Sequence, residues 1–171
     1  HRLLDLLRGD GSFVELEERL AARLARAPDD PEAWIELARL REASLHAPAG
    51  AADAYREALR RGAEPGLALR GLRRACSALG DWPEVARTLE AELERDVSPA
   101  RRADLLRELG EVTWHRLGAT TRASRAFAAA LEADPRDLVS LRSLRALLAS
   151  MEDWRGALDL VESEIELLQP L

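Results

Sequence analysis

Arginines that recur at regular intervals are the residues of this sequence best suited to bind a ligand. One position repeats at intervals of 35, 37 and 35 residues, and it is occupied by Ile35, Arg70, Arg107 and Arg142. Two further arginines, Arg39 and Arg74, lie one helical turn beyond Ile35 and Arg70. A guanidinium group is planar and can pair with a carboxylate through two parallel hydrogen bonds. The pattern therefore predicts a basic surface that binds an acidic protein or peptide segment through these five arginines.

Neutralisation by carboxylates of the chain itself is the alternative interpretation. Arg107 has Asp104 three residues before it and Glu111 four residues after it, and side chains at these spacings meet on a helix. Arg70 and Arg142 have no acidic residue three or four positions away within their segments. The sequence leaves both interpretations open.

An apolar contact would be needed beside the arginines. Exposed ion pairs contribute about 0.2–1 kcal/mol each, so arginines alone give little better than millimolar affinity, which corresponds to about −4.1 kcal/mol. Trp114 lies off the apolar stripe of its segment and has His115 beside it. Trp114 either packs on the next helix pair or is exposed. In the second case, Trp114 and His115 would anchor the partner.

Groups that could catalyse a reaction or hold a metal are scarce. The three histidines, His1, His46 and His115, have no mutual spacing that suits a metal site. Cys76 is the single cysteine and takes an apolar position in a helical pattern, which is typical of a core residue. The sequence contains no glycine-rich phosphate loop and no G-x-S-x-G motif. We therefore expect no enzymatic activity, no cofactor and no metal.

The charge of the chain disfavours nucleic acid as a partner. The 171 residues carry a net charge of −6, although all 25 basic residues are arginine. Proteins that bind nucleic acid by neutralising phosphates are basic. No apolar run approaches the roughly 20 residues that span a bilayer, so no membrane contact is expected. The absence of lysine and asparagine is typical of a GC-rich bacterial genome.

An internal duplication determines where these residues lie. A shift of 72 residues aligns Leu69-Arg70 with Leu141-Arg142, Asp81-Trp82 with Asp153-Trp154, and Tyr55 with Phe127. Each unit divides into two segments of about 35 residues in which apolar residues recur at intervals of three and four. This periodicity predicts helices at 12–27, 31–46, 49–62, 66–79, 82–96, 99–117, 119–133, 136–150 and 152–168. Residues 2–8 are expected to end an earlier helix.

Capping signals mark several of the helix starts. A capping oxygen precedes a proline at Asp30-Pro31, Ser98-Pro99 and Asp134-Pro135. Capping boxes are predicted at Ser12 with Glu15 and at Asp81 with Glu84. Trp82 and Trp154, which each follow an aspartate at a helix start, are expected to pack over the preceding turn.

These residues resemble the signature of the tetratricopeptide repeat (TPR) family. One copy of the signature is formed by Leu109-Gly110, Ala123, Phe127, Ala130-Leu131 and Pro135, and a second by Trp34, Leu37-Ala38, Ala51, Tyr55 and Ala58-Leu59. The pairs that open at 66 and 136 match less well, because Arg73 and Arg145 stand where the family prefers a small residue. The resemblance implies a right-handed superhelix in which the first helix of each pair lines a concave groove.

The distribution of charge gives this groove a predicted sign. The helices at 66–79 and 136–150 carry an excess of arginines over acids, whereas the second helices of the pairs are rich in acids. We therefore expect a basic concave lining and an acidic outer layer.

We interpret the chain as an all-α, right-handed TPR-like solenoid of about four antiparallel helix pairs plus a leading helix. Residues 1–171 are expected to form a single array that belongs to a longer protein, because the chain opens inside a repeat and closes on an amphipathic helix without a polar cap. The expected location is the cytoplasm. The predicted function is a non-enzymatic scaffold whose arginine-lined groove binds an acidic segment. The alternative is a self-assembling or structural spacer arm that associates through its open ends.

Overall fold

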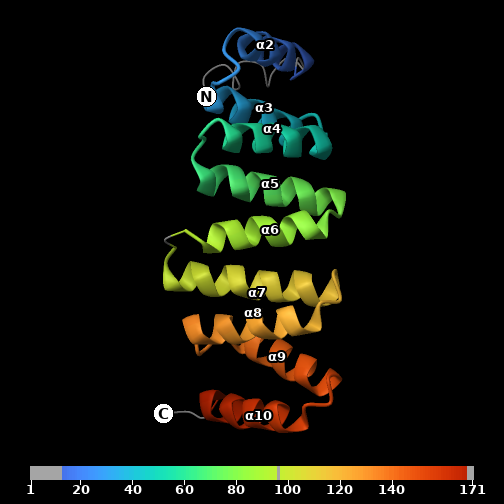
Figure 1. Ribbon diagram of the computed structural model, residues 1–171, viewed down its shortest axis with the longest axis vertical. Coiled ribbons are helices and arrows are strands. Elements are labelled where there is room, and N and C mark those ends of the chain that lie inside the picture. The colour runs from blue at the N-terminus through green and yellow to red at the C-terminus, as the bar shows by residue number, and fades with distance from the viewer. Residues whose placement is uncertain (1–12, 96, 169–171) are drawn as a thin grey trace. The chain divides into compact units, whose positions relative to one another are not determined.

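The computed structural model describes residues 13–95 and 97–168, and within them it contains helices and turns but no strand. The helices are α2 (Phe13–Arg26), α3 (Pro31–Ala43), α4 (Pro48–Arg60), α5 (Pro65–Leu79), α6 (Trp82–Leu93), α7 (Pro99–His115), α8 (Thr120–Ala133), α9 (Leu138–Ser150) and α10 (Trp154–Leu168) (Figure 1). Each of these helices lies within a few residues of its predicted range, so the predicted all-α fold is confirmed. The predicted helix at 2–8 and Ser12 of the first capping box lie outside the described residues.

Two of the predicted caps before a proline are confirmed, and so is the cap at Asp81, whose carboxylate accepts a hydrogen bond from the backbone N–H of Glu84. The Asp30 carboxylate accepts hydrogen bonds from two backbone N–H groups in the first turn of α3. The Ser98 hydroxyl oxygen accepts one from the backbone N–H of Arg101 in α7. In both helices a proline occupies the first turn, where its missing N–H costs no hydrogen bond.

The predicted cap at Asp134 is wrong. Asp134 ends α8, and its carboxylate accepts a hydrogen bond from the backbone N–H of Arg136 in the turn that follows. Asp137 caps α9 instead, because its carboxylate accepts from the N–H groups of Val139 and Ser140. Pro135 lies in the turn before α9, so α9 begins three residues later than the Asp134-Pro135 pair suggests.

The chain divides into two compact units, residues 1–88 and 89–171. In the first unit, α2 packs on α3, α3 on α4 and α4 on α5, with successive helices running in opposite directions (Figure 1). The Tyr55 ring of α4 is fully buried against Gly71 of α5, where a Cβ atom would lie 2.2 Å from the ring. Trp34 of α3 packs on a cluster formed by Ala58, Ala63 and Ala68.

In the second unit, α7, α8 and α9 correspond to α3, α4 and α5 of the first. Here α7 packs on α8, α8 on α9 and α9 on α10. The Phe127 ring of α8 is fully buried against Gly110 of α7, where a Cβ atom would lie 2.6 Å from the ring. Alanines of the second helices are buried at the predicted positions, which are Ala51, Ala54, Ala58, Ala123, Ala126 and Ala130. Small residues therefore allow the helix axes to approach each other beside one large aromatic ring in each unit.

Replacement of Gly110 by alanine is expected to lower the free energy of unfolding by about 1–3 kcal/mol, because the added methyl group overlaps the Phe127 ring. Urea unfolding measures this difference. Gly50→Ala is the matched control, since its Cβ would meet only the flexible side chain of Arg41 and alanine is the better helix former. If both variants are as stable as the wild type, the Phe127 ring does not pack closely against Gly110.

Candidate protein-binding surface

A cavity of about 480 Å³ lies in the first unit between α3, the turn that joins α4 to α5, and the first turn of α5. Ile35 and Leu67 supply its apolar lining, and Arg39 lies at its edge. Glu32, Glu36 and Glu64 also line it, so this part of the surface is mixed in charge rather than uniformly basic. The cavity includes Ile35, the one apolar residue of the recurring position found in the sequence.

Two of the predicted arginines beside this cavity are available to a partner. Arg39 and Arg70 are exposed, and neither forms a hydrogen bond or an ion pair with a residue in the described part of the chain. The charge of Arg39 does help to lower the pKa of Glu42. Arg39 lies one helical turn after Ile35, and Arg70 lies one turn after Leu67. Since α3 and α5 both run antiparallel to α4, the two arginines follow the cavity in the same direction along neighbouring helices.

Arg74 forms an internal ion pair. Its Nε and Nη2 atoms lie 2.7 and 3.0 Å from the two carboxylate oxygens of Glu42 in α3, and the Tyr55 hydroxyl donates a hydrogen bond of 2.8 Å to the same carboxylate. The hydrogen bond to Glu42 raises the pKa of Arg74. Burial alone would raise the pKa of Glu42, but the hydrogen bonds from Arg74 and Tyr55 outweigh it and the pKa of Glu42 is lowered. One carboxylate thus connects three consecutive helices.

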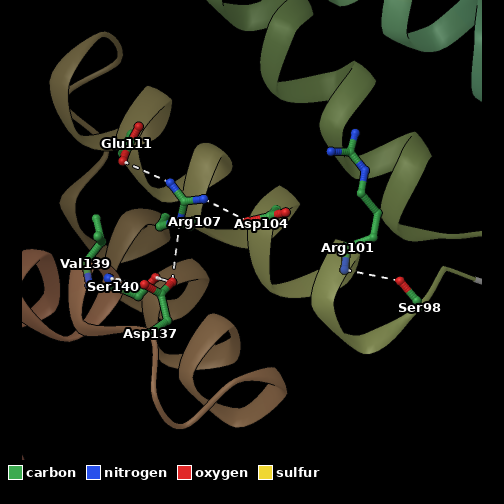
Figure 2. Close-up of polar contacts among 8 residues, drawn as sticks. All are labelled: Ser98, Arg101, Asp104, Arg107, Glu111, Asp137, Val139 and Ser140. Atoms are coloured by element: carbon green, nitrogen blue, oxygen red, sulfur yellow. Dashed lines mark hydrogen bonds and ion pairs between the residues drawn. The ribbon is translucent and has the colours of Figure 1, made fainter.

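Arg107 in the second unit is surrounded by carboxylates, as Figure 2 shows. It donates to Asp104 at 2.8 Å, and its guanidinium lies 3.4 Å from Asp137 and 4.0 Å from Glu111. The hydrogen bond to Asp104 is the main reason why the pKa of Arg107 is raised. The predicted pairing of Arg107 with Asp104 and Glu111 is confirmed. Three carboxylates around one guanidinium leave this site locally negative.

Arg142 is also paired, but with a residue far away in the sequence. Its Nε atom lies 2.6 Å from Glu164 of α10, and Arg145 donates to the other oxygen of the same carboxylate. Glu164 is only 8% exposed, and the hydrogen bond from Arg142 is the main reason why its pKa is lowered. The ion pair therefore links α9 to α10 in the second unit.

Trp114 packs on the next helix pair rather than standing free. It is half-buried against a cluster formed by Phe127 of α8 with Leu144 and Leu147 of α9. Its ring meets the Phe127 ring edge-on, with 6.3 Å between centroids. The exposed His115 ring stacks on the indole at 4.3 Å. The two rings form a small half-buried platform at the end of α7.

The predicted acidic outer layer is wrong for two of its members. Glu92 is 4% exposed and Glu164 is 8% exposed, because each is turned toward arginines of a first helix. In the repeat alignment they stand where Ala58 and Ala130 stand in the other pairs. A carboxylate at a position that other repeats fill with a small residue was the signal for a buried ion pair.

Trp154 was expected to pack over the preceding turn, but 62% of its surface is exposed.

Other chemical groups offer no second candidate within the described ranges. Cys76 is fully buried as predicted, and this burial raises the pKa of its thiol to about 11. No group of three or more His, Cys, Asp and Glu side chains among residues 13–95 and 97–168 could hold a metal ion. None of the helices in these ranges is both long enough and apolar enough to cross a membrane.

The duplication supplies a matched pair of variants that separates paired from unpaired arginines. Arg142→Ala is expected to lower the midpoint of urea unfolding, because the buried carboxylate of Glu164 loses one of its two partners. Arg70→Ala, at the equivalent position 72 residues earlier, is expected to leave the midpoint unchanged. Equal midpoints for the two variants would contradict the structural role given to Arg142.

The lowered pKa of Glu42 predicts a dependence of stability on pH. A carboxylate whose pKa falls on folding stabilises the protein above its ordinary value of 4.5, and this contribution is lost as the pH falls through the folded-state pKa. The difference in unfolding free energy between the wild type and Glu42→Gln should therefore be full at pH 7 and shrink below about pH 4.5. Thermal unfolding of both proteins from pH 7 to pH 3 measures it. A difference that does not change with pH would rule out the ionised Glu42–Arg74 pair.

Solved structures similar to this chain identify its fold, whereas sequence comparison finds no match. No protein-family model matches the sequence, and no curated protein matches it. Among solved structures, YrrB, described as a TPR protein with an unusual peptide-binding site, is 18% identical, with a TM-score of 0.67 over 96% of this chain and 82% of YrrB.

Two further structures give the same result. MamA from Desulfovibrio magneticus RS-1 is 17% identical, with a TM-score of 0.63 over 97% of this chain and 91% of that structure. PilF from Pseudomonas aeruginosa is 18% identical, with a TM-score of 0.58 over 99% of this chain and 74% of PilF. The buried Tyr55 and Phe127 lie at the aromatic position of the repeat signature, each against a glycine of a neighbouring first helix. The chain therefore has the helix-pair fold of tetratricopeptide-repeat proteins.

Proposed function

We propose that this chain is a non-enzymatic interaction module and that the first unit binds an acidic segment of another protein. The observation that supports the proposal is the cavity lined by Ile35 and Leu67, with the unpaired Arg39 at its edge and the unpaired Arg70 one turn beyond Leu67. A large apolar side chain of the partner fills the cavity, and neighbouring carboxylates pair with the two arginines.

The expected binding free energies explain why both the apolar cavity and the two arginines are needed. Two exposed arginine–carboxylate pairs supply about 0.4–2 kcal/mol together, and full burial of one leucine-sized side chain supplies about 1.5–3 kcal/mol. Their sum corresponds roughly to millimolar affinity. A tighter complex needs further contacts along the first helices, which a segment of several residues can make.

The acids of the cavity give the bound segment a preferred orientation. Glu32 lies in the first turn of α3, and Glu64 caps α5, so both carboxylates lie at the N-terminal ends of these helices. Arg39 and Arg70 lie further along the same helices. A segment with carboxylates on one side of its apolar anchor binds best, with those carboxylates toward Arg39 and Arg70 and away from Glu32 and Glu64.

The remaining predicted contacts, at Arg74, Arg107, Arg142, Trp114 and His115, stay predictions. A partner carboxylate would have to replace Glu42 at Arg74, Asp104 at Arg107 or Glu164 at Arg142. The platform of Trp114 and His115 needs no such exchange, since His115 is exposed. It is the second place where an apolar side chain of a partner could rest.

An array of synthetic peptides tests the proposal. Each peptide carries a central leucine or tryptophan, with glutamates after it, glutamates before it, or lysines in place of the glutamates. We expect the acidic peptides to bind, one of the two orders to bind better, and binding to weaken as salt rises, because exposed charges are screened. Equal or better binding of the lysine peptides would contradict the proposal.

Variants locate the binding to this surface. The double variant Arg39→Ala/Arg70→Ala should lose about tenfold in affinity for the best acidic peptide, as expected for the loss of about 1.4 kcal/mol, without loss of thermal stability. The control is Arg60→Ala, which removes an exposed arginine of α4 that pairs with Glu57. A double variant that binds as tightly as the control would show that these two arginines are a solvated surface only.

A further inference from the structure

The polar groups that line the cavity of the first unit are mostly hydrogen-bond acceptors. The charged lining residues are Glu32, Glu36, Glu64 and Arg39, and the apolar lining includes Ile35 and Leu67. A leucine or phenylalanine side chain that fills this cavity displaces water from the carboxylates and offers them no N–H or O–H group in exchange. An acceptor that loses water without gaining a donor lowers the affinity. The lining therefore favours an anchor that is apolar along its length and carries a donor at its tip.

Glu32 and Glu36 are the two carboxylates that can accept a hydrogen bond from a ligand. The Glu32 carboxylate forms no hydrogen bond or ion pair with any residue in 13–95 and 97–168. Glu36 lies 3.5 Å from Arg23 of α2, a distance at the limit of a hydrogen bond. Glu64 differs, because its two carboxylate oxygens accept from backbone N–H groups in the first turn of α5 at 2.8 and 2.7 Å. A donor that enters the cavity thus meets the carboxylates of α3.

The two carboxylates lie on the same face of α3 as the apolar wall. Glu32, Ile35, Glu36 and Arg39 follow at intervals of three, one and three residues, and side chains at these spacings are neighbours on a helix. Ile35 is half-buried and packs on the alanine cluster that contains Ala63, so its position is fixed. A ring that packs on Ile35 therefore brings a group at its tip within reach of Glu32 or Glu36.

The cavity has room for an aromatic ring. Its volume of about 480 Å³ falls within the roughly 300–1,000 Å³ of typical ligand pockets. The turn between α4 and α5 contributes only the small residues Gly62 and Ala63 to the lining. A Cβ atom built on Gly62 would meet nothing within 4 Å beyond its chain neighbours, so the space beside this turn is open. A planar side chain larger than leucine can enter without moving the backbone.

The cations around the cavity favour a neutral donor over a lysine. Arg39 lines the cavity on the same helix face as the two carboxylates, and Arg23 lies beside Glu36. A lysine would bring its ammonium group close to both guanidinium groups, and this repulsion offsets its attraction to the acids. A tyrosine hydroxyl donates to a carboxylate and adds no charge. The neutral phenol therefore matches both the apolar walls and the charges.

We infer that the cavity selects a tyrosine of the acidic partner segment as its anchor. The ring packs on Ile35 and Leu67, and the hydroxyl donates a hydrogen bond to Glu32 or Glu36. The inference rests on the function proposed above and names the side chain that the segment inserts. It also gives the two glutamates a role in a surface that binds acids, because they determine which anchor is accepted.

Three synthetic peptides test the choice of anchor. They share the glutamates of the better acidic order and differ only in the central residue, which is tyrosine, phenylalanine or lysine. Titration calorimetry at low salt should show the tyrosine peptide binding about tenfold more tightly than the phenylalanine peptide, because only one oxygen atom separates them and that atom carries the donor. Equal affinities would overturn the selection of tyrosine and leave the binding of acidic segments standing. A lysine anchor that binds more tightly than tyrosine would also overturn it, whereas failure of every acidic peptide would remove the proposed function as well.

The double variant Glu32→Ala/Glu36→Ala places the selection at these carboxylates. The ratio of the affinities for the tyrosine and phenylalanine peptides should fall from about ten to about one. Each ratio is measured on one protein with two peptides of equal charge, so a change in net charge or in the folded fraction cancels. Glu18→Ala, which removes an exposed glutamate of α2 that does not line the cavity, is the control and should keep the ratio. A ratio that stays at about ten in the double variant would contradict the role given to Glu32 and Glu36.

Discussion

Close contact between an aromatic ring and a glycine of a neighbouring helix is the constraint on which both units depend. Tyr55 lies on Gly71 and Phe127 lies on Gly110 at distances that leave no room for a Cβ atom. Helices that approach this closely bury their alanines, which form the core together with buried leucines in a chain with only 4% aromatic residues. The orientations of α5 and α7, and hence the placement of Arg70 and Arg107, follow from this contact.

Local sequence signals were enough to predict the helices, because periodicity and capping act within a few residues. The caps at Asp30 and Ser98 and the burial of Cys76 were predicted in this way. The ion-pair partners of the arginines could not be predicted, because they come from distant helices. Arg74 pairs with Glu42, which is 32 residues away, and Arg142 pairs with Glu164, which is 22 residues away. The one local sign of such a pair was a carboxylate, as at Glu164, in a repeat position that other helices of this chain fill with alanine.

The ion pairs divide the recurring arginines into two classes. Arg74, Arg107 and Arg142 hold one helix to another within a unit, whereas Arg39 and Arg70 face solvent beside the cavity. At each of the two recurring positions the copies therefore differ: Arg70 is unpaired where Arg107 and Arg142 are paired, and Arg39 forms no ion pair where Arg74 does. A net charge of −6 for the whole chain conceals this division, since each internal pair cancels its own charge.

The shared carboxylate of Glu42 has a consequence for the cavity. It accepts hydrogen bonds from Arg74 of α5 and from Tyr55 of α4, and it belongs to α3 itself. Since α3 and the first turn of α5 both line the cavity, this link between the two helices limits how far they can separate before any ligand arrives. A pre-organised wall spares the complex the entropic cost of ordering it. Loosening the link, for instance by loss of the Tyr55 hydroxyl, would widen the range of side chains that the cavity admits and lower the affinity for each.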